Sequence, residues 1–504
     1  MKLILLFLFL SFIPPAFCQG TLTPLEKNNY KSPTSYNSLV AFLKELVKDN
    51  SFMQMSFIAR SVEGREIPAV KITSTDFEDT SKIRVLIFAQ QHGDEHSGKE
   101  GSLLLLKEIA GGRLNYIFQR INLIIVPQMN PDGSEKNVRK NSNGKDLNRN
   151  HLILTQPETI GLHKIINQYL PEASVDVHEY YPYGEEWLKF GYIKNFDEQI
   201  GAATNLNVSK SIRDYSNNQF LPFIKSYLEE KGYSFQNYLL GGPPGENIFR
   251  HSTFDINDGR QSMAILNSFS FILEGRNGRD SLDNIKRRTE GQAAAMEGFL
   301  EFIYRNKDEI KTMVHKEREK LFNKDQKVVI MMEHVKGDKP LQLSLLSLYS
   351  NKDTVISVDE YHSEVKSLME IEKPEGYLVS KKDSGIVQML NNHKIKYESY
   401  KAIKDHIIEK FFITNIDSID FEGDKIPSPK FETNSFQSIS DPEDYYFIPL
   451  NQLHSNMIVL AFEPESMLGL STYEALYGDF SGFLKKNGAY PVMRVRKQIS
   501  GEKN

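Results

Sequence analysis

The chain has 504 residues, of which 40% are hydrophobic and 25% charged. This globular composition excludes wholesale disorder, collagen-like repeats and coiled-coil architecture, and at about 100–200 residues per domain it predicts two or three domains. Lys and Arg number 61 against 66 Asp and Glu, for a formal net charge of −5, so the strong basic excess of a nucleic-acid-binding protein is missing.

The first eighteen residues predict a secretory signal. Lys2 supplies a positive start, residues 3–13 are apolar, and Ala16-Phe17-Cys18 forms a small-x-small cleavage site before Gln19. The apolar run is too short to span a bilayer, and no later segment reaches the ~18 apolar residues of a membrane helix. A buried N-terminal strand and a lipid anchor on Cys18 are the alternatives, although a bulky Phe17 disfavours the anchor. We therefore expect a secreted or periplasmic protein.

Cys18 is the only cysteine of the chain. Cleavage after it would leave a mature protein without any thiol. Disulfides, cysteine nucleophiles and thiolate metal sites are therefore excluded for that mature chain.

The segments that follow alternate between helices and strands as far as about residue 323. A helix is expected within 32–49, and two strands at 55–60 and 67–72. Apolar strands without polar alternation then follow at 83–89, 121–126, 173–177 and 269–273, with helices at 101–110, 160–169 and within 289–322. Such strands belong to a sheet covered on both faces, which predicts an α/β fold. Residues 127–149 and 178–269 are expected to be rich in loops.

The pattern changes after Lys324, where we place a domain boundary. Strands are predicted at 328–332, 341–348, 411–415 and 445–449, and helices at 384–392 and 397–410. The second half, residues 324–504, is therefore expected to be an α+β domain in which strands dominate.

The segment after the 83–89 strand contains the pattern His92-x-x-Glu95. An imidazole nitrogen and a carboxylate at this spacing can point at one metal ion, and zinc takes both kinds of ligand. The pair alone is weak evidence, because His406 and Glu409 repeat it within a predicted amphipathic helix that has no other chemistry nearby. We read that second copy as structural.

Two further residues stand at the ends of buried strands. His178 follows Asp176-Val177, and Glu274 ends the apolar segment Phe269–Leu273. Sites in α/β sheets form beyond the carboxyl ends of strands, so His178 can meet His92 and complete a three-ligand zinc site. Glu274 suits a general base near the metal, while a role in orienting a ligand histidine is its alternative.

Taken in order, these segments resemble the zinc carboxypeptidase family, the carboxypeptidase A-like metallopeptidases. The resemblance runs from about residue 30 to 300 and also includes the following segments: Ser61-Val62-Glu63-Gly64-Arg65, Asn130-Pro131-Asp132-Gly133, Arg139 and Asp146-x-Asn148-Arg149-Asn150. It implies the family fold, a mixed, mostly parallel eight-stranded sheet between helices, and a catalytic domain over residues 19–323.

The resemblance also implies roles for the site residues. His92, Glu95 and His178 would bind one zinc ion, and Glu274 would be the general base and acid. Arg139 would polarise the scissile carbonyl, while Asn148 and Arg149 would hold the C-terminal carboxylate of a peptide. The implied function is a secreted zinc metallocarboxypeptidase that hydrolyses C-terminal peptide bonds with a zinc-activated water.

One functional feature of the family is missing from its usual place. Classical members carry a substrate-capping tyrosine some twenty residues before the catalytic glutamate, whereas residues 250–260 contain none. His251 or Arg260 could cover the substrate instead, and neither is assigned. The preferred C-terminal residue and the oligomeric state stay open.

The second half resembles the C-terminal region of larger bacterial secreted members through Pro374–Val379 and Phe462–Ser466. We expect it to be an accessory domain of unknown role, in which Glu463 and Glu465 are surface or interdomain residues. Alternative functions are a zinc amidase on cell-wall peptides or acyl-amino acids and a non-catalytic binding protein. The intact set of site residues disfavours the binding protein.

Overall fold

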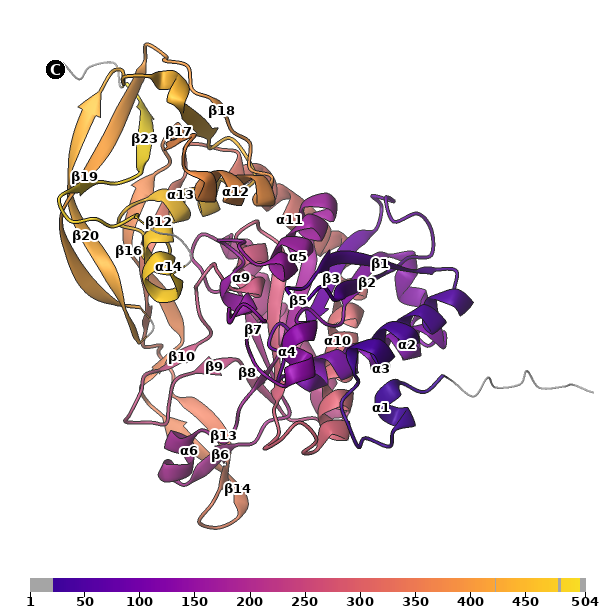
Figure 1. Ribbon diagram of the computed structural model, residues 1–504. Coiled ribbons are helices and arrows are strands. Elements are labelled where there is room, and N and C mark those ends of the chain that lie inside the picture. The colour runs from indigo at the N-terminus through magenta and orange to yellow at the C-terminus, as the bar shows by residue number, and fades with distance from the viewer. Residues whose placement is uncertain (1–20, 422, 479–481, 499–504) are drawn as a thin grey trace, which may run out of the picture.

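The computed structural model describes residues 21–421, 423–478 and 482–498, so the expected signal segment and Cys18 lie outside the described residues. Its centre is an eight-stranded sheet (Figure 1). In spatial order the strands are β1 (Met53–Arg60), β2 (Glu66–Ile72), β4 (Ile121–Val126), β3 (Ile83–Ala89), β5 (Ala173–Tyr180), β11 (Phe269–Arg276), β7 (Glu198–Ala202) and β8 (Phe235–Asn237). The pairs β4–β3, β3–β5, β5–β11 and β7–β8 are parallel and the others antiparallel. The expected mixed, mostly parallel sheet is confirmed.

Helices cover both faces of this sheet, as the uninterrupted apolar strands predict. In β3, Val85 and Ile87 join a core with α2 (Tyr36–Asp49), α3 (His96–Ala110) and α10 (Ile285–Arg305). Leu86 and Phe88 join the opposite core with α5 (Pro157–Tyr169) and α9 (Gly259–Ala264). Successive side chains of a strand point to opposite faces, so only a strand apolar at every position can face two cores.

The segments expected to be loops contain more regular structure than predicted. In the first of them lies α4 (Pro131–Lys136), whose first turn is capped by the Asn130 side chain accepting from the Gly133 N–H at 2.9 Å. The segment between His178 and Phe269 contains strands β7 and β8 and several short elements. Besides α9, they include α6 (Glu185–Phe190), β6 (Tyr192–Lys194), α7 (Lys210–Tyr215), α8 (Leu221–Glu230), β9 (Leu239–Leu240) and β10 (Phe249–His251). Most are too short for periodicity to reveal.

The second half is rich in strands, as expected. Its largest sheet has the order β18 (Glu398–Ser399), β21 (Tyr445–Pro449), β17 (Gly376–Ser380), β23 (Val492–Lys497), β19 (His406–Phe421) and β20 (Asp424–Phe436), with β22 (Gly488–Ala489) on β19. The remaining strands are β12 (Lys327–Val335), β13 (Leu341–Ser347), β14 (Lys352–Val358), β15 (Tyr361–His362) and β16 (Glu364–Glu372). Its helices are α12 (Ser384–His393), α13 (Ser455–Phe462) and α14 (Leu470–Tyr477), and α11 (Lys307–Leu321) precedes the half.

The helix predicted over 397–410 is wrong, because this segment contains β18 and the start of β19. His406 and Ile408 are buried while the residues between and after them are more exposed, which is the period of two of a strand. The β-branched and aromatic residues that follow, including Phe411 and Ile413, also favour a strand.

The two halves share sheets and a core. Strand β13 pairs with β6, and β15 pairs with β10. One apolar core includes Leu152 and Phe254 from the first half and Ile458 and Phe462 from the second. The boundary near residue 323 stays a prediction. Among the described residues no helix is both long and apolar enough to cross a membrane.

Candidate metal centre and substrate cleft

The carboxyl ends of β3 and β5 bring together the three predicted metal ligands. Their parallel register places Ala89 opposite Val177, so His92, just past β3, lies beside His178, near the end of β5. Glu95 stands at the start of α3. Gly93 allows this loop to lie against the Gly133 backbone, since a Cβ on Gly93 would come within 2.1 Å of the Gly133 carbonyl carbon.

The ligand atoms of these residues converge on one point. Glu95 Oε1 lies 2.6 Å from His92 Nδ1, and Glu95 Oε2 lies 2.9 Å from His178 Nδ1. The two Nδ1 atoms are 3.1 Å apart. The three side chains can therefore offer their ligand atoms to one cation, and histidine nitrogen and carboxylate oxygen are ligand types that zinc binds.

The opposite nitrogen of each imidazole faces a carboxylate. His92 Nε2 lies 3.1 Å from Asp146 Oδ1, and His178 Nε2 lies 2.9 Å from Asp176 Oδ1. Because a carboxylate accepts hydrogen bonds, each Nε2 carries the proton and each Nδ1 lone pair is directed into the site. This donor set fits zinc. Among the described residues, His92, Glu95 and His178 form the only group with three converging ligand atoms.

Electrostatics keeps the carboxylate ligand ionised. Burial by itself would raise the pKa of Glu95, but the His92 and His178 rings hold it well below its usual range. Burial likewise opposes ionisation of Asp146, and His92 and Arg139 together lower its pKa. Both acids are therefore charged across the working pH range of an enzyme.

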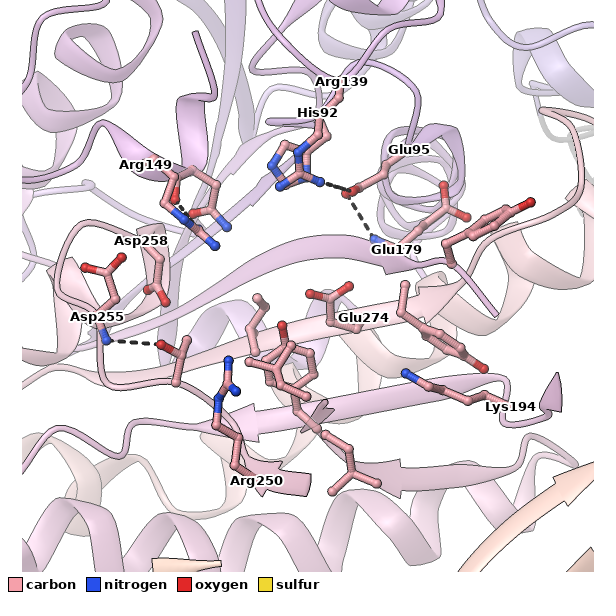
Figure 2. A pocket seen from close by; sticks show the side chains of 18 of the residues that line it. His92, Glu95, Arg139, Arg149, Glu179, Lys194, Arg250, Asp255, Asp258 and Glu274 are labelled. Carbon is pink, nitrogen blue, oxygen red and sulfur yellow. Dashed lines mark hydrogen bonds and ion pairs between the residues drawn. The ribbon is translucent and has the colours of Figure 1, made fainter. Parts of the chain in front are cut away.

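Glu274 stands directly beside the ligands, because β11 pairs in parallel with β5 and sets Glu274 opposite His178. Its carboxylate points into the cleft (Figure 2). Burial, reinforced by the charge of Glu95, raises its pKa to about 7. A carboxylate with this pKa can exchange protons near neutral pH, as a general base must.

The three predicted polar residues from the 139–149 loop also lie at this cleft. Arg139 is half-exposed, donates to Asp146 Oδ2 at 3.0 and 2.9 Å, and lies 3.6 Å from Glu95. Arg149 lines the cleft on the side of Asp255 and Asp258 (Figure 2). Asn148 is buried deeper than the arginines, and its side-chain oxygen accepts from the Gly259 N–H at 2.7 Å.

Sequence reasoning missed a tyrosine in the cleft wall. Tyr238 lines the cleft between β8 and β9, and its ring lies against Gly201 on one side and 5.8 Å from the Arg260 guanidinium on the other. Burial, followed by the charge of Glu274, raises the pKa of its hydroxyl. The sequence feature that could have indicated this residue is its position directly before the apolar pair Leu239-Leu240 and the Gly241-Gly242 turn.

The two residues considered as substitutes for the capping tyrosine lie elsewhere. Arg260 is fully buried and bonded to Asp258 at 3.0 Å. His251 is buried in β10. Neither Arg260 nor His251 is among the described residues that line the cleft.

The second half contributes to the same cleft, whose volume is about 400 Å³. Phe421 and Asp424, at the facing ends of β19 and β20, complete its wall. The second His-x-x-Glu pattern is not part of it, because Glu409 accepts from Arg494 at 2.9 Å and Arg496 at 3.0 Å. Glu463 is not a surface residue either: it is buried and paired with Arg494.

The family model described as zinc carboxypeptidase matches residues 39–169, which include His92, Glu95, Arg139, Asn148 and Arg149. Carboxypeptidase 2 of Trichophyton rubrum is 23% identical over 503 residues, covering 96% of this chain and 90% of that relative. Carboxypeptidase D of Mus musculus is 27% identical over 237 residues, covering 40% of this chain and 17% of that relative.

Two solved carboxypeptidases match about half of the chain. A metallo-carboxypeptidase from Burkholderia cenocepacia has a TM-score of 0.42 and 20% identity, covering 54% of this chain and 71% of that one. The carboxypeptidase A of Helicoverpa armigera has a TM-score of 0.42 and 18% identity, covering 54% of this chain and 72% of that one.

Proposed function

We propose that this chain, whose residues 39–169 match the zinc carboxypeptidase family model, is a secreted zinc metallocarboxypeptidase that removes single residues from the C-termini of peptides. The observation that carries the proposal is the convergence of His92 Nδ1, His178 Nδ1 and Glu95 on one point, with the Glu274 carboxylate in the same cleft. We assign catalysis to residues 19–323 and an accessory role to residues 324–504.

His92, Glu95 and His178 would hold one zinc ion. When bound, zinc supplies a Lewis acid that polarises a carbonyl and lowers the pKa of a water molecule to around 7. Asp146 and Asp176 keep the Nε2 protons on the two histidines and thereby the ring orientation that ligation requires.

Glu274 acts as the general base and acid. Its carboxylate takes a proton from the attacking water and returns it to the leaving amine. A pKa of about 7, set first by burial, makes both directions of transfer accessible at neutral pH. Arg139 polarises the scissile carbonyl from the opposite wall and stabilises the oxyanion that develops there.

Arg149 and Asn148 hold the C-terminal carboxylate of the substrate. A guanidinium binds a carboxylate through two parallel hydrogen bonds, which restricts cleavage to the chain end. Asn148 lies in the same turn, where its side-chain oxygen accepts from the Gly259 N–H and its amide nitrogen lies 3.2 Å from His178 Nε2. The Tyr238 hydroxyl, buried in the opposite wall, covers the bound residue in place of the missing capping tyrosine.

Residues 19–504, expressed without the signal segment, test this function with a library of peptides read by mass spectrometry. The expected products lack one or a few C-terminal residues, and product formation stops with a zinc chelator and in Glu274→Gln. Peptides with an amidated C-terminus should resist cleavage, because they offer Arg149 no carboxylate.

Three outcomes would contradict the proposal. Internal cleavage would exclude an exopeptidase, and equal cleavage of amidated peptides would exclude the role of Arg149. No cleavage by the zinc-loaded protein would exclude a general carboxypeptidase. Secretion is tested separately by the N-terminus of the protein from the medium or periplasm, where a start at Gln19 is expected.

A further inference from the structure

A series of buried polar side chains, joined by hydrogen bonds, extends from the candidate metal centre. Gln91 is completely buried beside the ligand His92. Its amide nitrogen lies 2.9 Å from both carboxylate oxygens of Asp176, and its amide oxygen lies 2.7 Å from His151 Nε2. Asp176 in turn accepts from His178 Nε2 at 2.9 Å.

Only one assignment of donors and acceptors fits this series of side chains. The Asp176 carboxylate only accepts, so Gln91 must present its NH2 group to Asp176 and its oxygen to His151. His151 must therefore carry its proton on Nε2. Its Nδ1, 3.1 Å from His163 Nε2, is then the acceptor for the next residue. A reversed Gln91 amide would set its oxygen against the carboxylate.

The protonation state of His151 suits this task. Burial lowers its pKa to about 4, so its ring is neutral and carries one N–H at neutral pH. His163 and His393 follow in ring contact, with centroids 5.3 and 5.2 Å apart along the series. His393 Nε2 donates to the Leu152 carbonyl at 2.7 Å, so the series of rings ends on the backbone next to His151.

We propose that His151 is a positioning residue for the metal centre: its Nε2–H locks the amide of Gln91, which fixes Asp176 and so the orientation of the ligand His178. The inference rests on the proposed function in one respect, that His178 binds zinc. Removal of a residue that orients a metal ligand typically weakens the affinity of the protein for the metal by about 10–100-fold.

A matched pair of variants tests the proposal. Gln and Met are similar in size and shape, but His151→Gln keeps a donor that can reach the Gln91 oxygen and His151→Met has none. Zinc affinity is measured on residues 19–504 by competition with a chromophoric chelator, which needs no catalytic turnover. We expect His151→Met to bind zinc about tenfold more weakly, and His151→Gln to stay within about threefold of the parent protein.

The control is His406→Met, which removes a buried histidine of β19 in the second half, whose ring contacts Tyr400 and Phe447 and not the histidine series. It should leave zinc affinity unchanged. Thermal unfolding of the metal-free variants reports any general loss of stability. If His151→Met does not fold, His151→Asn replaces it, because the shorter Asn amide falls short of the Gln91 oxygen and should show the same loss.

The outcomes separate the inference from the function beneath it. Equal zinc affinities for His151→Gln and His151→Met, whether both unchanged or both reduced, would overturn the positioning role. Failure of the parent protein to bind zinc, or binding that survives His178→Ala, would instead refute the proposed metal site. A loss confined to variants without the donor supports the proposal.

Discussion

The hydroxyl of Tyr473 donates a hydrogen bond to the carboxylate of Asp255, which joins helix α14 of the second half to the wall of the substrate cleft. The neighbouring Phe254 stacks on His334, with ring centroids 4.9 Å apart, and meets Phe421 at 5.8 Å. Strand β15 pairs with β10 just before this segment. The second half therefore holds one wall of the cleft in place.

Tyr473→Phe should weaken substrate binding. Among the described residues, the Asp255 carboxylate would keep only the hydrogen bond that it accepts from the Asn257 N–H, at 2.9 Å, so Asp255 would be held less firmly in the cleft wall. A hydrogen bond to a charged group contributes about 1.5–3 kcal/mol at most, so we expect a three- to tenfold rise in KM with kcat within twofold. Steady-state kinetics on short peptides measures both.

Tyr490→Phe provides the matched control, since its hydroxyl is buried in the same half and has no hydrogen-bond partner among the described residues. This variant should keep the parent kinetics. Equal kinetic constants in Tyr473→Phe and the parent would show that the second half does not tune the cleft through Asp255.

Glu274 should set the acid side of the pH profile. A general base acts only when deprotonated, so kcat/KM should rise with pH through the pKa of Glu274. Burial places that pKa at about 7 in the metal-free protein, and a bound cation favours the charged carboxylate, so the rise should lie at or below pH 7. Initial rates measured under kcat/KM conditions across pH 5–9 give the profile.

Glu274→Gln should reduce kcat by at least about 100-fold while zinc stays bound. Asp424→Asn changes another acid of the same cleft and should leave the acid limb in place. An acid limb that persists unchanged in the residual activity of Glu274→Gln would assign it to a different group.

Tyr238→Phe tests the hydroxyl of this cleft-lining tyrosine. The ring would remain between Gly201 and Arg260, so the fold should be preserved. We expect KM to rise about three- to tenfold, the equivalent of one ordinary hydrogen bond of about 0.5–1.5 kcal/mol, with a smaller change in kcat. Unchanged KM for several C-terminal residues would show that the hydroxyl does not contact substrate.

His454→Leu should make the protein less sensitive to acid. Burial, with His393 nearby, lowers the pKa of His454 from 6.5 to about 3. The unfolded chain therefore binds this proton first, and folded-state stability falls as pH decreases from 6.5 to 3. The variant should lose about 1.4 kcal/mol less per pH unit over that range. Urea unfolding of chelator-treated protein at several pH values measures the difference, and parallel curves would contradict a buried neutral His454.

The ligands and their strands could be predicted from the sequence because their signals are local. His92-x-x-Glu95 stands within four residues, and an apolar strand precedes both His92 and His178. The same local patterns predicted the central sheet. The 397–410 segment was predicted wrongly, because its pairing partners β21 and β23 lie further along the chain and decide its conformation.

By itself, the sequence determined the residue types available to the site and the order of strands and helices that carries them, since both depend on neighbours along the chain. Only the tertiary structure decided that Tyr238 lines the cleft, that His151 bonds to Gln91 and that Tyr473 holds Asp255. Gln91 and His151 are 60 residues apart and Asp255 and Tyr473 are 218 apart. No local pattern encodes such contacts, because they form only when buried polar groups from distant segments must satisfy one another inside the packed protein.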